Sequence, residues 1–267
     1  MHTFDDYEIY DGHSHIFPQK IARKAAQAIG DFYEREMRYS GESEMLIKSG
    51  SKINVRKYLV CSTATVPQQT SNINDFIINE CREHSEFIGF GTLHPDAENM
   101  DEEIEKIISG DLKGIKIHPD FQKFNIDDEK AMNIYRKIEG RLPILIHMGD
   151  DRYDFSKPYR LAKVLDEIPG LKVFAAHLGG YQCWDESIKL LSKRENVIFD
   201  TSSTLAFVSV EYAKKIISEF NTDNLIFGTD FPMWDHSEEL ERFFALELSD
   251  DKNKKILSEN FKRIFNV

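Results

Sequence analysis

Asp11-Gly12-His13-Ser14-His15 ends an apolar run that starts at residue 7. Side chains alternate between the two faces of a strand, so the two histidines are expected on the same face. Two imidazoles held side by side at a strand end can share one divalent cation, although such a pair also occurs simply hydrogen-bonded. Three later apolar runs end in His147, His177 and Asp230. The question is whether one fold brings these four ends together.

Short apolar runs alternate with helical stretches along most of the chain. Strands are predicted over residues 7–15, 58–61, 87–93, 114–118, 143–147, 172–177, 197–200 and 225–230. Helices are predicted over 21–39, 74–84, 101–108, 128–138, 159–168, 184–191, 210–220, 238–246 and 252–264, with a polar loop over 41–51. The strands are nearly continuous apolar runs, as expected of parallel strands that are covered on both faces.

Eight strands that alternate with helices predict an α/β fold of the TIM (β/α)8 barrel type. An open, doubly wound sheet is the alternative, but it would require a glycine-rich phosphate-binding turn after the first strand, and Asp11-Gly12-His13 does not provide one. No Pro/Gly/Ser-rich linker divides the chain, so residues 1–267 are expected to form a single domain.

Composition limits the range of functions. The 267 residues are 41% hydrophobic, which is enough for a full core, and the net charge of −12 argues against nucleic-acid binding. Three cysteines without a CxxC motif suit a reducing cytoplasm better than a disulfide framework. The segment Met1–Asp6 does not resemble a signal peptide, and no apolar run reaches the roughly 18 residues of a membrane span. We therefore expect a soluble, cytoplasmic protein.

Polar residues gather at the predicted strand ends, which open on one face of a barrel, where active sites lie. They are His13, His15, His94, Lys116, His118, His147, His177 and Asp230. Six of the nine histidines are in this set, which indicates a functional site rather than scattered surface residues.

Five motifs together resemble the amidohydrolase superfamily. They are Asp11-x-His13-x-His15, Gly114-Ile115-Lys116-Ile117-His118-Pro119, Ile146-His147, Ala176-His177-Leu178-Gly179-Gly180 and Phe227-Gly228-Thr229-Asp230-Phe231-Pro232. More narrowly, the chain is similar to the branch of TIM-barrel metal-dependent hydrolases that includes aminocarboxymuconate-semialdehyde decarboxylase. The resemblance extends to the terminal segment 260–265, but residues 18–57 and 148–158 contain no recognisable motif.

The resemblance implies that His13, His15, His147 and Asp230 bind one divalent metal ion. Three imidazoles and one carboxylate suit Zn²⁺ best, with Mn²⁺ or Fe²⁺ as alternatives. The cation would lower the pKa of a bound water towards about 7 and polarise a substrate carbonyl. His177 would lie beside this water, and Asp230 or His177 would transfer the proton to the leaving group.

Lys116 and His118 are predicted to contact the substrate. Lys116 could anchor a substrate carboxylate, form a buried ion pair or, when carbamylated, bridge to a second metal. His94 is expected to be structural. Asp200 could line the pocket or cap a following helix.

The leading functional hypothesis is a metal-dependent hydrolase that cleaves a carbonyl-type bond (amide, ester or lactone) in a small molecule. The alternative is a metal-dependent, non-oxidative decarboxylase of a small carboxylated substrate, because the ligand motifs describe the metal and not the bond. A metal-storing or inactive barrel is disfavoured because His177 and Asp230 are both present. By resemblance, a homodimer is expected.

Overall fold

The computed structural model describes residues 7–267, so the segment 1–6, which was inspected for a signal peptide, lies outside the described residues. Eight parallel strands are hydrogen-bonded in chain order. Their bounds are β1 (Ile9–His15), β2 (Val55–Cys61), β3 (Phe87–Thr92), β4 (Gly114–Ile117), β5 (Ile144–Ile146), β6 (Val173–Ala175), β7 (Val197–Asp200) and β8 (Leu225–Ile226). This arrangement confirms the predicted TIM barrel.

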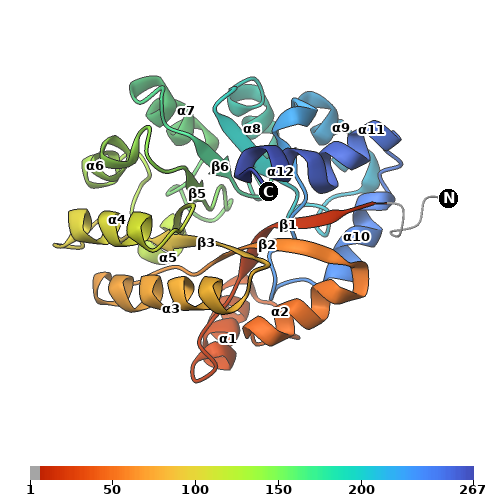
Figure 1. Cartoon of the computed structure of the whole chain (residues 1–267). Helices are drawn as coiled ribbons and strands as arrows, with labels where there is room; N and C mark the ends of the chain where they lie inside the picture. Colours follow the sequence, from red (N-terminus) through yellow and green to blue (C-terminus); the bar gives the residue numbers. More distant parts are fainter. Residues whose placement is uncertain (1–6) are drawn as a thin grey trace.

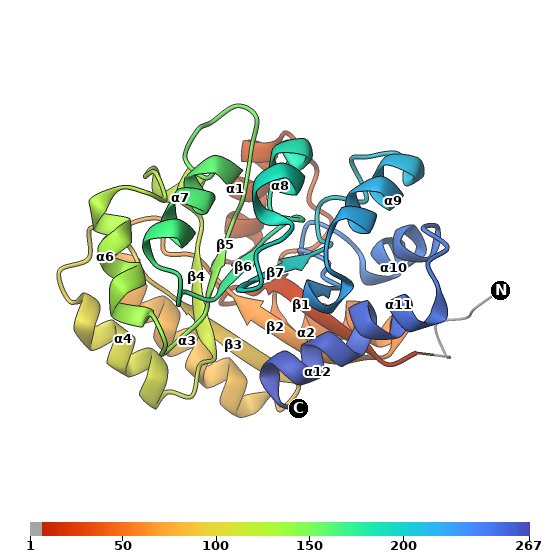
Figure 2. The same ribbon diagram turned by 90° about the horizontal axis from the view of Figure 1, so that it is seen from above.

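Helices surround the strands in both ribbon views (Figures 1 and 2). Their bounds are α1 (Ala22–Tyr33), α2 (Ser43–Gly50), α3 (Thr70–Glu83), α4 (Met100–Ser109), α5 (Pro119–Gln122), α6 (Glu129–Ile138), α7 (Pro158–Glu167), α8 (Trp184–Leu191), α9 (Val210–Glu219), α10 (His236–Phe244), α11 (Asp250–Lys254) and α12 (Asn260–Phe265). Each major helix packs an apolar side against the strands. In α6, for example, Met132, Ile134 and Tyr135 are buried.

The barrel closes between β1 and the segment that follows β8. Three backbone hydrogen bonds form this seam: Gly12 N to Phe227 O (2.8 Å), Asp230 N to His13 O (2.7 Å) and His15 N to Phe231 O (2.6 Å). The ladder of β8 itself covers only Leu225–Ile226, which is shorter than the predicted strand 225–230. The seam places the two histidines of β1 beside Asp230.

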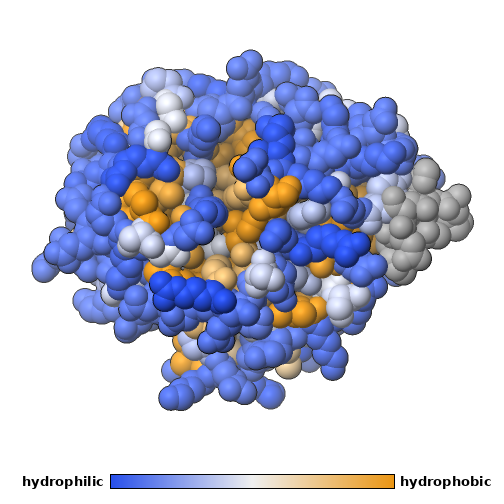
Figure 3. Space-filling model, viewed as in Figure 1, coloured by the Kyte–Doolittle hydropathy of each residue, from blue (hydrophilic) through white to orange (hydrophobic). Residues whose placement is uncertain are grey.

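Helix α12 covers the amino-terminal end of the barrel, in the middle of the view in Figure 1. The ring of Phe261 contacts Tyr10 (centroids 5.1 Å apart), and Phe265 contacts Phe90 (6.0 Å) and Phe174 (5.8 Å). Hydrophilic residues dominate this face of the molecule, with apolar residues visible between them towards its centre (Figure 3). The strands' carboxyl ends therefore open on the opposite side.

The first connection differs from the prediction. Helix α1 ends at Tyr33 rather than near residue 39, because Glu34 adopts a left-handed conformation (φ 54°). The predicted polar loop 41–51 contains α2, which buries Ser43, Leu46 and Ser49. This helix has a weak apolar pattern because its buried side uses serine hydroxyls, and Ser49 Oγ lies 2.9 Å from His236 Nδ1.

The carboxyl-terminal helices also depart from the prediction in detail. The predicted helix 252–264 is a continuous helical segment in which a π-helical turn, Lys255–Glu259, joins α11 to α12. Among the described residues, no helix is long and apolar enough to cross a membrane. All three cysteines are free.

The buried carboxylate of Asp11 joins both sides of the barrel seam. Its Oδ1 accepts hydrogen bonds from the backbone amides of His13 and Thr229, each at 3.0 Å. Its Oδ2 accepts from Ser14 Oγ (2.5 Å), Thr229 Oγ1 (2.6 Å) and His236 Nε2 (3.0 Å). A fully buried carboxylate is tolerated only when its oxygens are satisfied in this way.

Replacing Asp11 by asparagine is expected to destabilise the protein by about 3 kcal/mol, because one amide oxygen replaces two acceptors and the amide N–H groups would face other donors. Urea unfolding followed by circular dichroism measures the change. Asp31→Asn is the matched control, since Asp31 is exposed on α1 and should change stability by no more than about 0.5 kcal/mol. Equal unfolding midpoints for both variants would show that the Asp11 network contributes little.

Candidate active site

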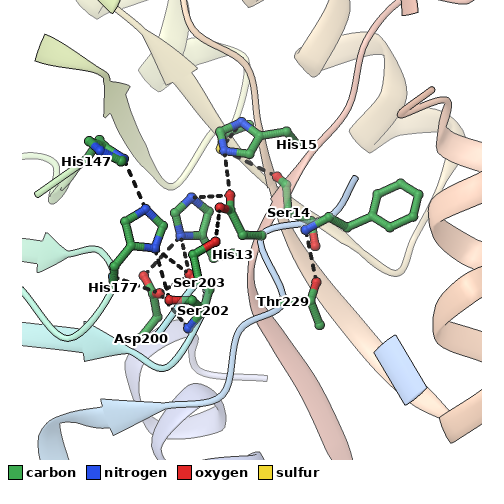
Figure 4. A network of polar contacts seen from close by, with 12 residues as sticks. His13, Ser14, His15, His147, His177, Asp200, Ser202, Ser203 and Thr229 are labelled. Carbon is green, nitrogen blue, oxygen red and sulfur yellow. Dashed lines mark hydrogen bonds and ion pairs between the residues drawn. The ribbon is translucent and has the colours of Figure 1, made fainter. Parts of the chain in front are cut away.

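A cavity of about 740 Å³ opens among the carboxyl ends of the strands. Four predicted site residues line it: His15 from β1, His118 after β4, His147 after β5 and Asp230 after β8. His13 and His177 are buried directly behind this surface. In Figure 4, His147 and His177 lie on one side of His13, and His15 lies on its other side. The fold thus brings the four strand ends together, as the sequence suggested.

His13 is held in one orientation by Asp200 at the end of β7. Its Nδ1 lies 3.1 Å from Asp200 Oδ2, so this nitrogen carries the proton and Nε2 presents its lone pair. Nε2 lies 3.7 Å from Asp230 Oδ1 and 3.2 Å from Lys116 Nζ. Burial, reinforced by the Lys116 charge, lowers the pKa of His13, although Asp200 opposes the shift. His13 is therefore a neutral ring with a fixed lone pair.

His15 and Asp230 face each other, with His15 Nε2 3.3 Å from Asp230 Oδ1. Burial raises the pKa of Asp230, but the hydrogen bond from His15 and the charge of His13 outweigh it and hold that pKa well below its usual range. Burial also lowers the pKa of His15, yet the neighbouring Cys61 and Asp230 raise it to about 9. Binding of a cation at His15 Nε2 would therefore have to displace a proton.

Asp230 is fixed from two further directions. Its Oδ2 accepts a hydrogen bond from Ser203 Oγ at 2.6 Å, and its backbone has a left-handed conformation (φ 58°). Such a conformation is costly for a residue other than glycine, asparagine or aspartate and is typical of functional sites. The backbone bond to His13 O maintains it, so the carboxylate points at the two β1 histidines.

His177 and His147 form a relay of hydrogen bonds. His177 Nδ1 lies 3.1 Å from the Ser202 carbonyl and so donates, which leaves Nε2 to accept from His147 Nδ1 at 3.0 Å. The lone pair of His147 is therefore on Nε2, 3.3 Å from the Tyr33 hydroxyl. Burial lowers the pKa of His177 to about 4, so the ring is neutral at pH 7.

The two predicted substrate contacts are placed differently. His118 lines the cavity, stacked between Phe121 (centroids 3.7 Å apart) and His147 (3.9 Å). Within residues 7–267, no hydrogen-bond partner reaches its buried Nδ1. Lys116 is fully buried, its Nζ contacts His13, and burial lowers its pKa.

A second group of ligand-type atoms is formed by His118, Asp120 and His147, whose donor atoms lie within 4.8 Å of one another. The two imidazoles, however, are stacked 3.9 Å apart and nearly parallel (9°). Their in-plane lone pairs therefore run side by side and do not converge on one point. At β1, His13 Nε2 and His15 Nε2 lie 3.7 and 3.3 Å from Asp230 Oδ1, and donor atoms of His13, His15 and Cys61 lie within 4.8 Å of one another.

Two functional residues were missed or left open by the sequence. Asp200 was assigned either to the pocket or to a helix cap, and in the structure it orients His13. Its position at the end of a strand was the available indication. Tyr33 comes from the first connection, which has no motif, and its hydroxyl also lies 3.2 Å from His118 Nε2. His94 is buried and accepts a bond from Asp96 N, as expected of a structural residue.

The lowered pKa of His177 makes stability depend on pH. Between pH about 6.5 and about 4 the unfolded chain protonates this ring and the folded chain does not, so the free energy of unfolding should fall as the pH falls through this range. We expect His177→Gln to reduce this slope in chelator-treated protein, measured by urea unfolding at successive pH values. Titration of the His177 ring near pH 6.5 in NMR spectra would contradict the assignment.

A family comparison identifies the chain. The model of the amidohydrolase family matches residues 10–267, and the chain therefore belongs to this family. A comparison with curated proteins finds no match.

Solved structures share the fold over nearly the whole chain. An uncharacterised TIM-barrel protein from Bordetella bronchiseptica is 16% identical, with a TM-score of 0.76 and coverage of 97% of this chain and 98% of its own. A dihydroxybenzoic acid decarboxylase from Polaromonas, solved with manganese and 2-nitroresorcinol, is 14% identical (TM-score 0.73, coverage 97% of both chains). A probable 2-pyrone-4,6-dicarboxylic acid hydrolase from Acinetobacter baumannii is 13% identical (TM-score 0.72, coverage 97% and 100%). Decarboxylases of 2,6-dihydroxybenzoate and 5-carboxyvanillate are also similar.

Proposed function

We propose that the protein is a metal-dependent, non-oxidative decarboxylase of a small carboxylated substrate. The observation that carries this proposal is an apolar cavity that ends at a cluster of imidazoles and one ionised carboxylate. The likeness to several decarboxylases, one of which contains manganese, supports it over the hydrolase that the sequence favoured.

The residues present fit a divalent metal ion. Asp200 fixes the lone pair of His13 on Nε2, and this nitrogen, His15 Nε2 and Asp230 Oδ1 face one another. A hydrogen-bonded carboxylate behind a histidine is the usual support of a metal ligand. We assign His13, His15, His147 and Asp230 as the ligands of one ion. The donor set is compatible with Zn²⁺, Mn²⁺ and Fe²⁺.

The ion would supply positive charge for the substrate's oxygen atoms. In the reaction the carbon–carboxyl bond breaks, CO₂ leaves, and the electron pair stays on the carbon and takes up a proton. One proton is taken up from solvent and delivered to that carbon, and Asp230 and His177 are the proposed carriers of it. Asp230 is ionised and His177 is neutral at pH 7, so neither group already holds this proton.

The apolar walls favour this reaction for a physical reason. A carboxylate loses hydration in an apolar environment, whereas CO₂ carries no charge and loses little. Desolvation of the reacting group therefore destabilises the substrate relative to the product. His118 remains the proposed contact for substrate oxygen atoms, whereas Lys116, which is fully buried and does not line the cavity, is proposed to act through His13.

Hydrolysis of a carbonyl-type bond is the second candidate, because a probable 2-pyrone-4,6-dicarboxylic acid hydrolase shares the fold. Residues 1–267 are proposed to act as one catalytic domain in the cytoplasm, and a homodimer stays a prediction.

Isotope labelling separates the two reactions. We expect aromatic carboxylic acids such as 2,6-dihydroxybenzoate to release CO₂ without uptake of ¹⁸O into the organic product, because no water oxygen enters it. The reaction is run in H₂¹⁸O and followed by mass spectrometry. Uptake of one ¹⁸O atom into the product, with amides, esters or lactones as substrates, would favour the hydrolase instead.

Metal content tests the ligand set. Elemental analysis is expected to find about one equivalent of Zn, Mn or Fe, and His13→Ala or Asp230→Ala should abolish it. Asp200→Asn should weaken metal binding by about 10- to 100-fold, because His13 loses its supporting carboxylate. His84→Ala, at the end of α3, is the control that should retain the metal. Equal metal content in all four variants would contradict the assignment.

A further inference from the structure

One wall of the cavity is formed by a single side of α1 and the residue just before it. The side chains of Ile21, Ala25, Ala28, Ile29 and Phe32 all line the cavity. Their spacing places them on one face of a helix. Apolar residues in this pattern usually face a protein core, but here Ile21 and Ala28 are exposed and the other three are half-buried.

The packing of α1 against the rest of the protein uses different residues. Ala22, Ala26 and Gly30 are the buried positions of the helix. They are small, and a Cβ at Gly30 would lie only 2.5 Å from the Arg35 carbonyl oxygen. The side of α1 with small residues therefore packs closely against the rest of the protein, and the side with larger apolar residues faces the cavity.

The rest of the cavity lining is also largely apolar. Phe17, Phe121, Ile73 and Met233 belong to this remaining part of the lining, together with the polar strand-end residues, and Phe121 contacts Phe32 of α1. A volume of about 740 Å³ is in the range that drug-sized ligands fill. A carboxylate on a single small ring would leave much of this apolar surface in contact with water, at a cost of about 25 cal/mol per Å².

Two lysines on the cavity lining favour an acidic ligand. Lys24 and Lys123 are exposed, and within residues 7–267 no carboxylate oxygen lies within 4.0 Å of either amine. The whole chain carries a net charge of −12, which repels anions. The positive charge of these two lysines beside the cavity opposes this repulsion locally and raises the rate at which anions enter.

We propose that the substrate is an amphipathic carboxylic acid whose apolar body is larger than one aromatic ring and lies along α1. The carboxylate is placed beside His118 at the proposed metal site, and this orientation rests on the proposed decarboxylase function. The size and apolar character of the body rest on the cavity walls alone. Ala25, Ile29 and Phe32 are then the residues that determine specificity.

Calorimetric titration of the metal-reconstituted protein with benzoate, 4-butylbenzoate and 4-hexylbenzoate tests the proposal. Affinity should rise by about fourfold per methylene while the chain fills the cavity, so 4-butylbenzoate should bind at least tenfold more tightly than benzoate. Equal affinities for the three acids would overturn the inference.

Ala25→Trp is expected to fill the cavity beside α1. This substitution should weaken the binding of 4-hexylbenzoate at least tenfold and change the affinity for benzoate by no more than about twofold. Arg23→Trp is the matched control, because Arg23 is exposed on α1 away from the cavity and both acids should bind as to the unmodified protein. Ile29→Ala provides a second variant, which should weaken only the alkylated acids. An equal loss of affinity for benzoate and for the alkylated acids would show that α1 does not contact the apolar body of the ligand.

These measurements do not require turnover, so they separate the two proposals. Tight binding of 4-hexylbenzoate without CO₂ release from any carboxylic acid would retain the apolar substrate body and reject the decarboxylase. Release of CO₂ from 2,6-dihydroxybenzoate, with no preference for alkylated acids, would retain the decarboxylase and reject the larger apolar substrate body.

Discussion

The buried carboxylate of Asp11 accepts five hydrogen bonds, from β1 on one side and from Thr229 and His236 on the other. Strand β8 is too short to pair with β1 along its length, so these bonds and three backbone contacts close the barrel. The same closure sets the distances from Asp230 to His13 and His15. Stability and site geometry therefore depend on one buried carboxylate whose hydrogen bonds must all stay in place.

Charge and proton positions in the site follow from a second layer of groups. Asp200 and the Ser202 carbonyl accept from the Nδ1 atoms of His13 and His177, and both rings present Nε2 towards the site. Burial keeps these imidazoles neutral, while the histidines keep Asp230 ionised. Once the proton of His15 is displaced, nitrogen lone pairs around one carboxylate suit a divalent cation, and the surrounding apolar walls strengthen its electrostatic effect.

The sequence predicted the eight strands and the polar residues at their ends, because parallel strands are continuous apolar runs and their carboxyl ends share one face. It did not predict α2, whose buried side includes Ser43 and Ser49 rather than an apolar stripe. Tyr33 was not singled out and Asp200 was left between a pocket residue and a helix cap, because their roles arise from contacts with residues 85 and 187 positions away. His236 is not among the predicted strand-end residues, yet it begins α10 and bonds Asp11.

The last helix also has a consequence for synthesis of the chain. Phe261 and Phe265 of α12 cover the apolar rings of Tyr10, Phe90 and Phe174, and the partners of Asp11 are 218 and 225 positions further along. Until residues 229–265 have been synthesised, the first strand has no seam to join and the amino-terminal end of the barrel lies open. The amino-terminal half of the nascent chain must therefore avoid aggregation until these residues are available, and folding is dominated by contacts of very long range.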